Sequence, residues 1–284
     1  MDIGLGLPST IPGVEPATVL RWALDAEARG FASIGVVDRL VYPNLDPLTM
    51  LAAAAVVTTD VRLVTGVLVT PIRSNFPAFA KQTATIDLLS GGRLVLGLGV
   101  GNREDDFTVA DLDYHRRGRS FDAQLAEITS IWRGDHPALG PAPSRVGGPE
   151  LLFGGTSKQT YQRMTRYGTG WFASSSTGAG FAAGRDVAVA AWEAAGRSGR
   201  PRLVAHSYAG VGARAVNSAK EYLGSYYAHR IADLDNIVGA ALLSEDLIRE
   251  RVELLGAAGC DEFILTPVDA DPDQVQLLAD AAGI

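Results

Sequence analysis

The chain alternates short apolar, β-branched runs with helical patterns, and this alternation constrains its fold more than any other feature. Runs typical of strands lie at residues 3–7, 32–37, 62–69, 93–99, 150–155, 170–174, 202–210 and 262–267, each followed by a helical pattern. Apolar strands separated by helices favour parallel pairing with both sheet faces covered. Eight such units in 284 residues predict an α/β fold, a single (β/α)8 barrel domain over residues 1–284. A doubly wound open sheet remains the alternative.

Two segments interrupt the alternation. Residues 102–117, after the fourth strand, are charged, and residues 134–149, after the fourth helix, are rich in Gly and Pro. We expect both to be insertion loops without regular structure. The first would lie at the barrel face that carries the chemistry of such enzymes, and the second on the opposite face or around the edge.

Composition excludes several classes of protein. The 25 basic and 32 acidic residues give a net charge of -7, which disfavours binding to nucleic acid or to an anionic membrane surface. No apolar run is long enough to span a bilayer, and the first ten residues do not resemble a signal peptide. One cysteine, Cys260, excludes an intrachain disulfide framework. We therefore expect a soluble cytoplasmic protein that acts on a small molecule.

The residues that follow each strand lack the usual catalytic groups. The four histidines show no paired metal-ligand spacing, so we expect no metal site. No strand ends on a lysine suited to a Schiff base, and no G-x-S-x-G nucleophile motif occurs. This pattern favours a site that binds a cofactor and leaves the reactive chemistry to it.

The segment FGGTSK, residues 153–158, is the sharpest local feature. Gly154 and Gly155 would let the backbone approach an anion, and Thr156 and Ser157 would add hydroxyls at the start of a helix. The pattern fits a phosphate site and an ordinary helix N-cap equally well.

Other candidates lie in strands three and seven or directly after strands two and four. Asp38 and Arg39 would contact a ligand or form a salt bridge in the barrel mouth. Gly66, inside a strand, indicates a bulge or a close backbone approach. We expect Tyr208 to line the pocket and His206 to be a core residue. Polar residues after the fourth strand would contact a ligand or lie in a solvated loop: Asn102, Arg103 and Glu104.

Several longer segments together resemble the bacterial luciferase-like superfamily of flavin-dependent oxidoreductases. The most specific is LSGGRLVLGLGVG, within residues 62–107. The opening IGLGLP, RRGRSFDAQLAEITSIW (116–132) and FGGTSKQTYQRMTRYGTGW (153–171) agree in order and spacing. The resemblance extends to about residue 173 and is weaker beyond it.

The resemblance implies a barrel that holds FMN or the deazaflavin coenzyme F-420 at the carboxyl ends of its strands. It implies a non-prolyl cis peptide between Gly66 and Val67, in a bulge behind the flavin-type ring. Asp38 would contact the polar edge of the ring, and the remaining cofactor contacts would come from Gly101, Asn102, Gly154, Gly155, Thr156 and Ser157. Because such proteins often form homodimers, a homodimer is the assembly the resemblance implies.

The chain departs from the family pattern at two places. Many deazaflavin members carry Asp-His where this chain has Asp38-Arg39, and the usual Gly-Asp-Gly-Trp is Gly168-Thr169-Gly170-Trp171. Arginine does not release its proton near neutral pH. Arg39 would instead stabilise negative charge on the reduced flavin or on the substrate.

These observations lead to one principal hypothesis and three alternatives. The principal hypothesis is hydride transfer from reduced F-420 to a small organic substrate, with Asp38, Arg39 and Glu104 as catalytic residues. The segments 102–117 and 174–180 would shape the substrate pocket. The alternatives are an FMN-dependent monooxygenase supplied by a partner flavin reductase, a flavin-binding protein without turnover, and a flavin-free barrel enzyme for a phosphorylated metabolite.

Overall fold

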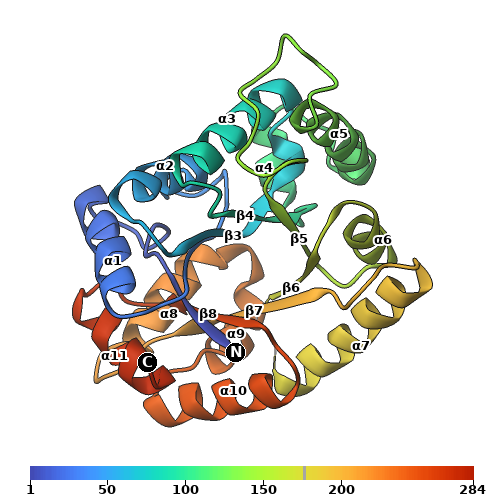
Figure 1. Cartoon of the computed structure of the whole chain (residues 1–284). Helices are drawn as coiled ribbons and strands as arrows, with labels where there is room; N and C mark the ends of the chain where they lie inside the picture. The colour runs from blue at the N-terminus through green and yellow to red at the C-terminus, as the bar shows by residue number, and fades with distance from the viewer. Residues whose placement is uncertain (175–176) are drawn as a thin grey trace.

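The computed structural model describes residues 1–174 and 177–284 and shows a closed parallel barrel (Figure 1). In the described residues eight strands pair in chain order, and β1 closes on β8. The strands are β1 Asp2–Gly6, β2 Ser33–Val36, β3 Arg62–Val69, β4 Leu94–Gly99, β5 Glu150–Gly154, β6 Gly170–Ser174, β7 Arg202–Ala209 and β8 Glu262–Pro267. The predicted barrel is confirmed and the open sheet is wrong.

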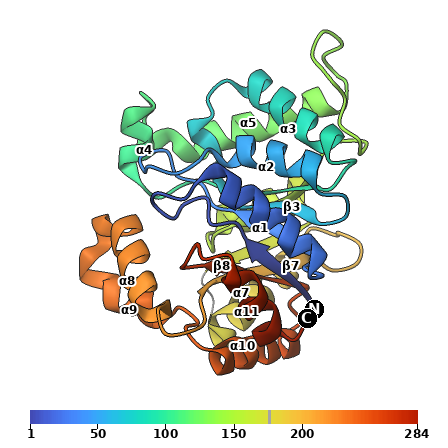
Figure 2. The same ribbon diagram turned by 90° about the vertical axis from the view of Figure 1, so that its left-hand side faces the viewer.

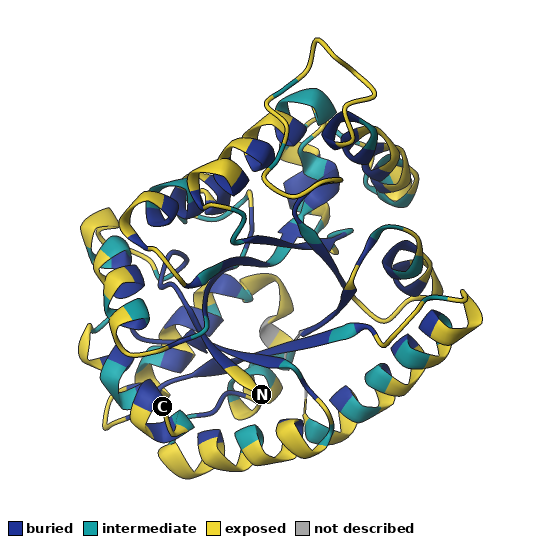
Figure 3. Ribbon diagram, in the orientation of Figure 1, coloured by how far each residue is buried: buried dark blue, intermediate teal, exposed yellow. Residues whose placement is uncertain are grey.

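Helices form a ring around the barrel. The ring consists of α1 Pro16–Ala28, α2 Pro47–Val57, α3 Phe76–Leu89, α5 Arg117–Trp132, α6 Lys158–Tyr167, α7 Gly178–Ala194, α10 Glu245–Ala257 and α11 Asp273–Ala282. Their inner faces are buried and their outer faces exposed (Figure 3). No helix of the described residues is both long and apolar enough to cross a membrane.

Three further helices lie at the end of the barrel opposite the chain termini (Figure 2). They are α4 Glu104–Val109, α8 Ala215–Tyr226 and α9 Leu234–Gly239. Because β1 starts beside the termini, this end carries the carboxyl ends of the strands. The fold therefore places α4, α8 and α9 around the barrel mouth, where enzymes of this architecture carry their sites.

The two insertions differ from each other. The segment 102–117 contains α4 and a short 3-10 turn, Tyr114–Arg116, so the prediction of an irregular loop was wrong there. Three acidic residues in the first turn of α4 favour the helix through its dipole, and buried Phe107 anchors it. The segment 134–149 contains no helix or strand and lies at the end with the termini (Figure 2). There the Ser144 amide donates to the Asp87 carboxylate at 2.7 Å.

The barrel interior is filled below its mouth. At the amino ends of the strands, buried Glu262 accepts hydrogen bonds from Ser33, Arg62 and Arg202. An apolar layer lies above it: Val64, Val95, Leu152, Phe172, Val204 and Ile264. The interior is therefore a packed core, and the space for a ligand lies at the carboxyl ends of the strands.

Candidate functional site

A cavity of about 550 Å³ lies at the barrel mouth, hereafter the mouth cavity. Its walls come from the ends of β2 to β7 and from α8, α9 and the turn between them. Its volume is in the usual range for a small-molecule site.

One wall of the mouth cavity is built on a bulge in β3. Thr65 pairs with Leu96 and Leu68 with Leu98, so β3 carries one extra residue, and the Gly66–Val67 peptide bond is cis. This geometry confirms the expected cis peptide and bulge.

Glycines on β4 and β5 make room for the Val67 side chain. A Cβ atom at Gly99 would lie 2.7 Å from Val67 Cγ2, and one at Gly154 would lie 3.0 Å from Val67 Cγ1. A Cβ at Gly97 would lie 2.0 Å from the Thr65 carbonyl oxygen. We call the surface formed by Gly66, Val67, Gly99 and Gly154 the glycine wall; it presents backbone and a single apolar side chain to the cavity.

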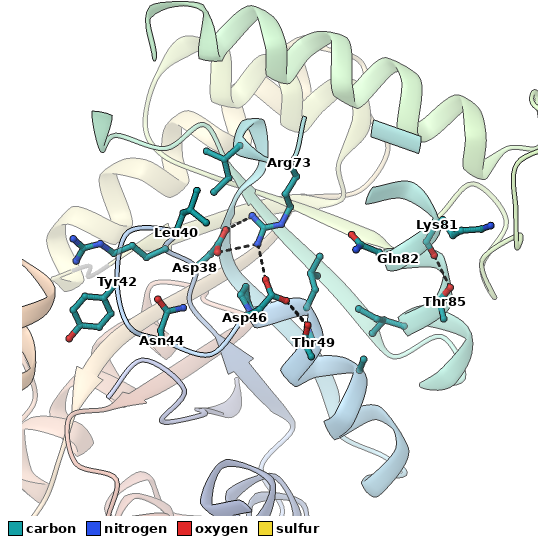
Figure 4. Close-up of a pocket in the computed structure, with 16 residues that line it drawn as sticks. Asp38, Leu40, Tyr42, Asn44, Asp46, Thr49, Arg73, Lys81, Gln82 and Thr85 are labelled. Carbon is teal, nitrogen blue, oxygen red and sulfur yellow. Dashed lines mark hydrogen bonds and ion pairs between the residues drawn. The ribbon is translucent and has the colours of Figure 1, made fainter. Parts of the chain in front are cut away.

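Asp38 borders the mouth cavity with a carboxylate that is already held in place. It accepts hydrogen bonds from the Val69 amide at 2.8 Å and from Arg73 Nη1 at 2.6 Å and Nη2 at 3.1 Å. Arg73 Nη2 also lies 3.8 Å from Asp46 Oδ2. Figure 4 shows Arg73 between the two carboxylates, on the side of a second cavity of about 710 Å³ between α2 and α3. The salt bridge anticipated for Asp38 exists, with Arg73 as its partner.

Arg39 and Glu104 lie apart from the mouth cavity. The Arg39 guanidinium donates to the Tyr226 carbonyl and lies over the Tyr42 and Tyr226 rings, 4.8 and 5.2 Å from their centroids. Burial, with the nearby Arg103 charge, lowers the pKa of Arg39. Glu104 is exposed at the start of α4. Of the three predicted catalytic residues, only Asp38 lines the mouth cavity.

Gly101 and Asn102 both line the mouth cavity, and Gly101 has a φ of +75°. Next to them, Arg103 bonds to Asp105 and to His229 Nδ1. Buried Asp106 accepts from the Leu40 and Val41 amides at 3.1 and 2.7 Å, and burial raises its pKa. Of the polar residues predicted after β4, Asn102 and Arg103 line the mouth cavity and Glu104 does not; Asp106 joins them at the rim.

Within the segment 153–158, the environment of the residues changes after Gly155. Gly154 and Gly155 line the mouth cavity, and Gly155 has a φ of +107°. Thr156 and Ser157 are exposed, and Ser157 Oγ accepts from the Thr160 amide at 3.2 Å as the N-cap of α6. The N-cap alternative is therefore correct; the phosphate interpretation stays a prediction.

Aromatic side chains form the wall that continues from Phe172. The row Phe172, His206, Tyr208, Tyr227 has successive ring centroids 5.7, 6.0 and 6.2 Å apart. We call these four residues the aromatic row; all line the mouth cavity. Tyr208 lies where the sequence predicted it.

His206 is buried, as expected of a core residue, and it also lines the mouth cavity. Every second side chain of β7 points to the inner face of the barrel. Val204, His206 and Tyr208 therefore share that face, and His206 faces the mouth cavity. Burial lowers its pKa to about 4, so the imidazole is neutral near pH 7. A weak contact joins its Nδ1 to Thr266 Oγ1 at 3.4 Å.

The sequence did not identify two further groups of residues at the site. Arg73 follows the 3-10 turn Thr70–Ile72, and Tyr226 and Tyr227 lie at the end of α8; none directly follows a strand. The one signal that could have pointed to Arg73 is that the Asp38 carboxylate needs a basic partner. Of the segment 174–180, residues 175–176 lie outside the described residues.

Comparisons with known proteins agree with this architecture. The family model for luciferase-like monooxygenase matches residues 1–258. The uncharacterized protein Rv0953c of Mycobacterium tuberculosis is 26% identical over 247 residues, covering 72% of this chain and 83% of its own length.

Two solved structures share the fold at low sequence identity. Monooxygenase RslO1 from Streptomyces bottropensis has a TM-score of 0.82 at 20% identity, covering 99% of this chain and 98% of its own. An F420-dependent secondary alcohol dehydrogenase, in complex with an F420-acetone adduct, has a TM-score of 0.75 at 17% identity, with the same coverage of 99% and 98%. Since the family model covers most of the sequence and the barrel is present, the chain belongs to the luciferase-like monooxygenase family of flavin-dependent oxidoreductases.

Proposed function

We propose that the mouth cavity binds reduced coenzyme F-420 and that the enzyme uses it to reduce a small organic substrate. The observation that carries the proposal is that the glycine wall and the aromatic row adjoin in one cavity. A planar ring fits the first surface because no side chain except Val67 projects from it. The second surface leaves apolar space for a substrate beside the ring.

The residues present fit a flavin-type cofactor. Side chains at Gly99 or Gly154 would collide with Val67, so these positions keep the wall free for a ring. At the rim, Gly155 and the N-terminus of α6 would hold the phosphate, since the first turn of a helix offers unpaired N–H groups. Asn102 and Gly101 would contact the chain between ring and phosphate.

The protein's own residues position the cofactor and the substrate and keep water away from them. Bound F-420 supplies the hydride, and the barrel supplies placement and water exclusion. Asp38, oriented by Arg73, would accept a hydrogen bond from the polar edge of the ring. Arg39 and Glu104 lie outside the mouth cavity and have no place in this proposal.

The second candidate is an FMN-dependent monooxygenase that receives reduced flavin from a partner reductase. Two observations favour it: the similarity to RslO1, described as a monooxygenase, and Arg39 in place of the histidine of many deazaflavin members. Oxygen separates the candidates, because reduced deazaflavin reacts with oxygen poorly whereas reduced FMN reacts readily.

A turnover experiment tests the proposal. The protein is mixed without oxygen with reduced F-420 and a panel of ketones and activated alkenes, and the return of oxidised F-420 is followed by absorbance. Substrate-dependent oxidation of F-420 without oxygen supports the proposal. Product formation only with reduced FMN and oxygen contradicts it and selects the monooxygenase.

A further inference from the structure

The hydroxyl groups of Tyr208 and Tyr227 meet at the end of the aromatic row. Their oxygens are 3.0 Å apart, and both side chains line the mouth cavity. When Tyr208 donates its hydroxyl hydrogen, to Tyr227 or to the neighbouring Tyr222, the Tyr227 O–H hydrogen is left to be directed at a ligand. Burial raises the pKa of both phenols, so both keep their protons near neutral pH.

The row connects these hydroxyls to the glycine wall. A Cβ atom at Gly66 would lie 2.7 Å from Phe172 Cζ, so Phe172 packs directly against the bulge. His206 and then Tyr208 follow it toward α8. A molecule lying along the row would have its apolar body on Phe172 and His206 and its polar end at the two hydroxyls.

The mouth cavity offers no spare charge to such a molecule. Each charged side chain lining it, among the residues that the structure describes, already has a protein partner of opposite charge: Asp38 with Arg73, Arg103 with Asp105, Asp106 with Arg103, and Arg230 with Asp233. Neutral His206 adds none, and burial with the nearby Arg103 charge lowers the pKa of His229, which disfavours a charge there as well. An ionic group bound at the row would lose its hydration without gaining a counter-ion, which is costly.

We propose that the Tyr208–Tyr227 hydroxyl pair binds the carbonyl or hydroxyl oxygen of an uncharged substrate. The proposal deepens the function proposed above and rests on it for the claim that the bound molecule is a substrate. The hydroxyl pair is an oxygen-binding subsite in which the phenols donate the hydrogen bond. It selects neutral oxygen compounds over hydrocarbons and over ions of the same shape.

Ligand binding without any hydride donor tests the subsite. Cyclohexanone is titrated into the cofactor-free protein by saturation-transfer NMR, beside methylenecyclohexane, which has the same shape without the oxygen, and cyclohexanecarboxylate. We expect cyclohexanone to bind most tightly. Tyr227→Phe and Tyr208→Phe should each weaken it roughly five- to tenfold, the effect of one lost hydrogen bond.

Tyr42→Phe is the matched control. The Tyr42 hydroxyl pairs with Ser225 at 3.0 Å and the residue lines the second cavity, not the mouth cavity. Cyclohexanone affinity should be unchanged in this variant. Since Tyr227 is only half-buried, its variant keeps the test available if Tyr208→Phe folds poorly.

The outcomes separate the subsite from the cofactor. Equal affinity for cyclohexanone and methylenecyclohexane, no cyclohexanone binding to the wild type, or unchanged binding in both phenylalanine variants overturns the subsite. F-420 binding is titrated in the same proteins and should be unchanged. Hydroxyl-dependent ketone binding without F-420 binding would keep the subsite and remove the proposed cofactor.

Discussion

Asp38 and Arg73 form a two-contact ion pair, with Nη1–Oδ2 at 2.6 Å and Nη2–Oδ1 at 3.1 Å, where the mouth cavity and the cavity between α2 and α3 both reach Asp38. The carboxylate side chain is only 3% exposed. The pair holds the one predicted catalytic residue that lines the mouth cavity, so the orientation of Asp38 depends on an arginine outside that cavity.

Removal of Arg73 should therefore lower the stability of the fold. Arg73→Met leaves a buried carboxylate with only the Val69 amide as partner, and unfolding in urea should show a loss of about 3–5 kcal/mol. The double variant Asp38→Asn with Arg73→Met should recover part of that loss, because no charge is stranded. Arg21→Met, which breaks the exposed pair with Asp25, should cost about 0.5 kcal/mol or less. Equal losses for Arg73→Met and Arg21→Met would contradict this.

The glycine wall can be tested by adding one methyl group. Gly99→Ala places a Cβ atom 2.7 Å from Val67 Cγ2, so the wall must shift. Overpacking of this kind costs about 1–3 kcal/mol, and F-420 affinity should fall at least tenfold. Combining it with Val67→Ala should restore much of the stability, since the colliding methyl group is gone.

Gly256→Ala is the control for that substitution. A Cβ atom at Gly256, in α10, meets nothing within 4 Å, so alanine should stabilise the helix by up to about 1 kcal/mol and leave binding alone. A Gly99→Ala protein as stable as this control would show that Val67 does not limit the wall.

His206 predicts acid sensitivity of the fold. Its pKa is about 4 in the native state and 6.5 in an unfolded chain, so between these values the unfolded state binds more protons. Stability should fall as pH falls through this window, by roughly 3 kcal/mol at pH 4.

Replacing the imidazole identifies this contribution. His206→Gln should lose a large part of the pH dependence in urea unfolding between pH 6.5 and 4. His229 has a lowered pKa as well and will retain a smaller dependence of the same sign. His136→Gln, at an exposed position, should keep the wild-type slope because His206 is intact. An unchanged slope in His206→Gln would mean that the pKa of His206 is not lowered in the native state.

The start of α6 allows a comparison of two matched caps. Ser157 caps α6 and Ser244 caps α10, each accepting from an amide three residues later. Either alanine variant should cost about 1 kcal/mol of stability. Only Ser157→Ala should also weaken F-420, severalfold, because its hydroxyl lies at the proposed phosphate site. Equal F-420 affinity in both variants would remove Ser157 from that site.

The fold was largely predictable because the strand segments are short, mostly apolar runs separated by helical patterns. Residues 62–69 and 170–174, for instance, coincide with the bounds of β3 and β6. The α4 helix was missed because its residues are charged, and its only strong signals are the acidic first turn and Phe107.

The site was most predictable where it depends on the backbone. Gly66, Gly154 and Gly155 line the mouth cavity as expected, since glycine marks places where side chains do not fit. Asp38 lines the mouth cavity and Arg39 does not, because the Arg39 guanidinium is held by the Tyr226 carbonyl and the Tyr42 and Tyr226 rings. The contributions of Arg73 and Tyr227 arise from tertiary packing, which no local pattern encodes.

The central claim is that the mouth cavity holds F-420 against the glycine wall, and direct titration tests it best. The purified protein is titrated with oxidised F-420 and separately with oxidised and reduced FMN, following fluorescence and absorbance, with Gly99→Ala in parallel. We predict tight binding of F-420, weak binding of FMN, and at least tenfold weaker F-420 binding in Gly99→Ala. A preference for FMN would contradict the account, and so would an F-420 affinity that is unchanged in Gly99→Ala.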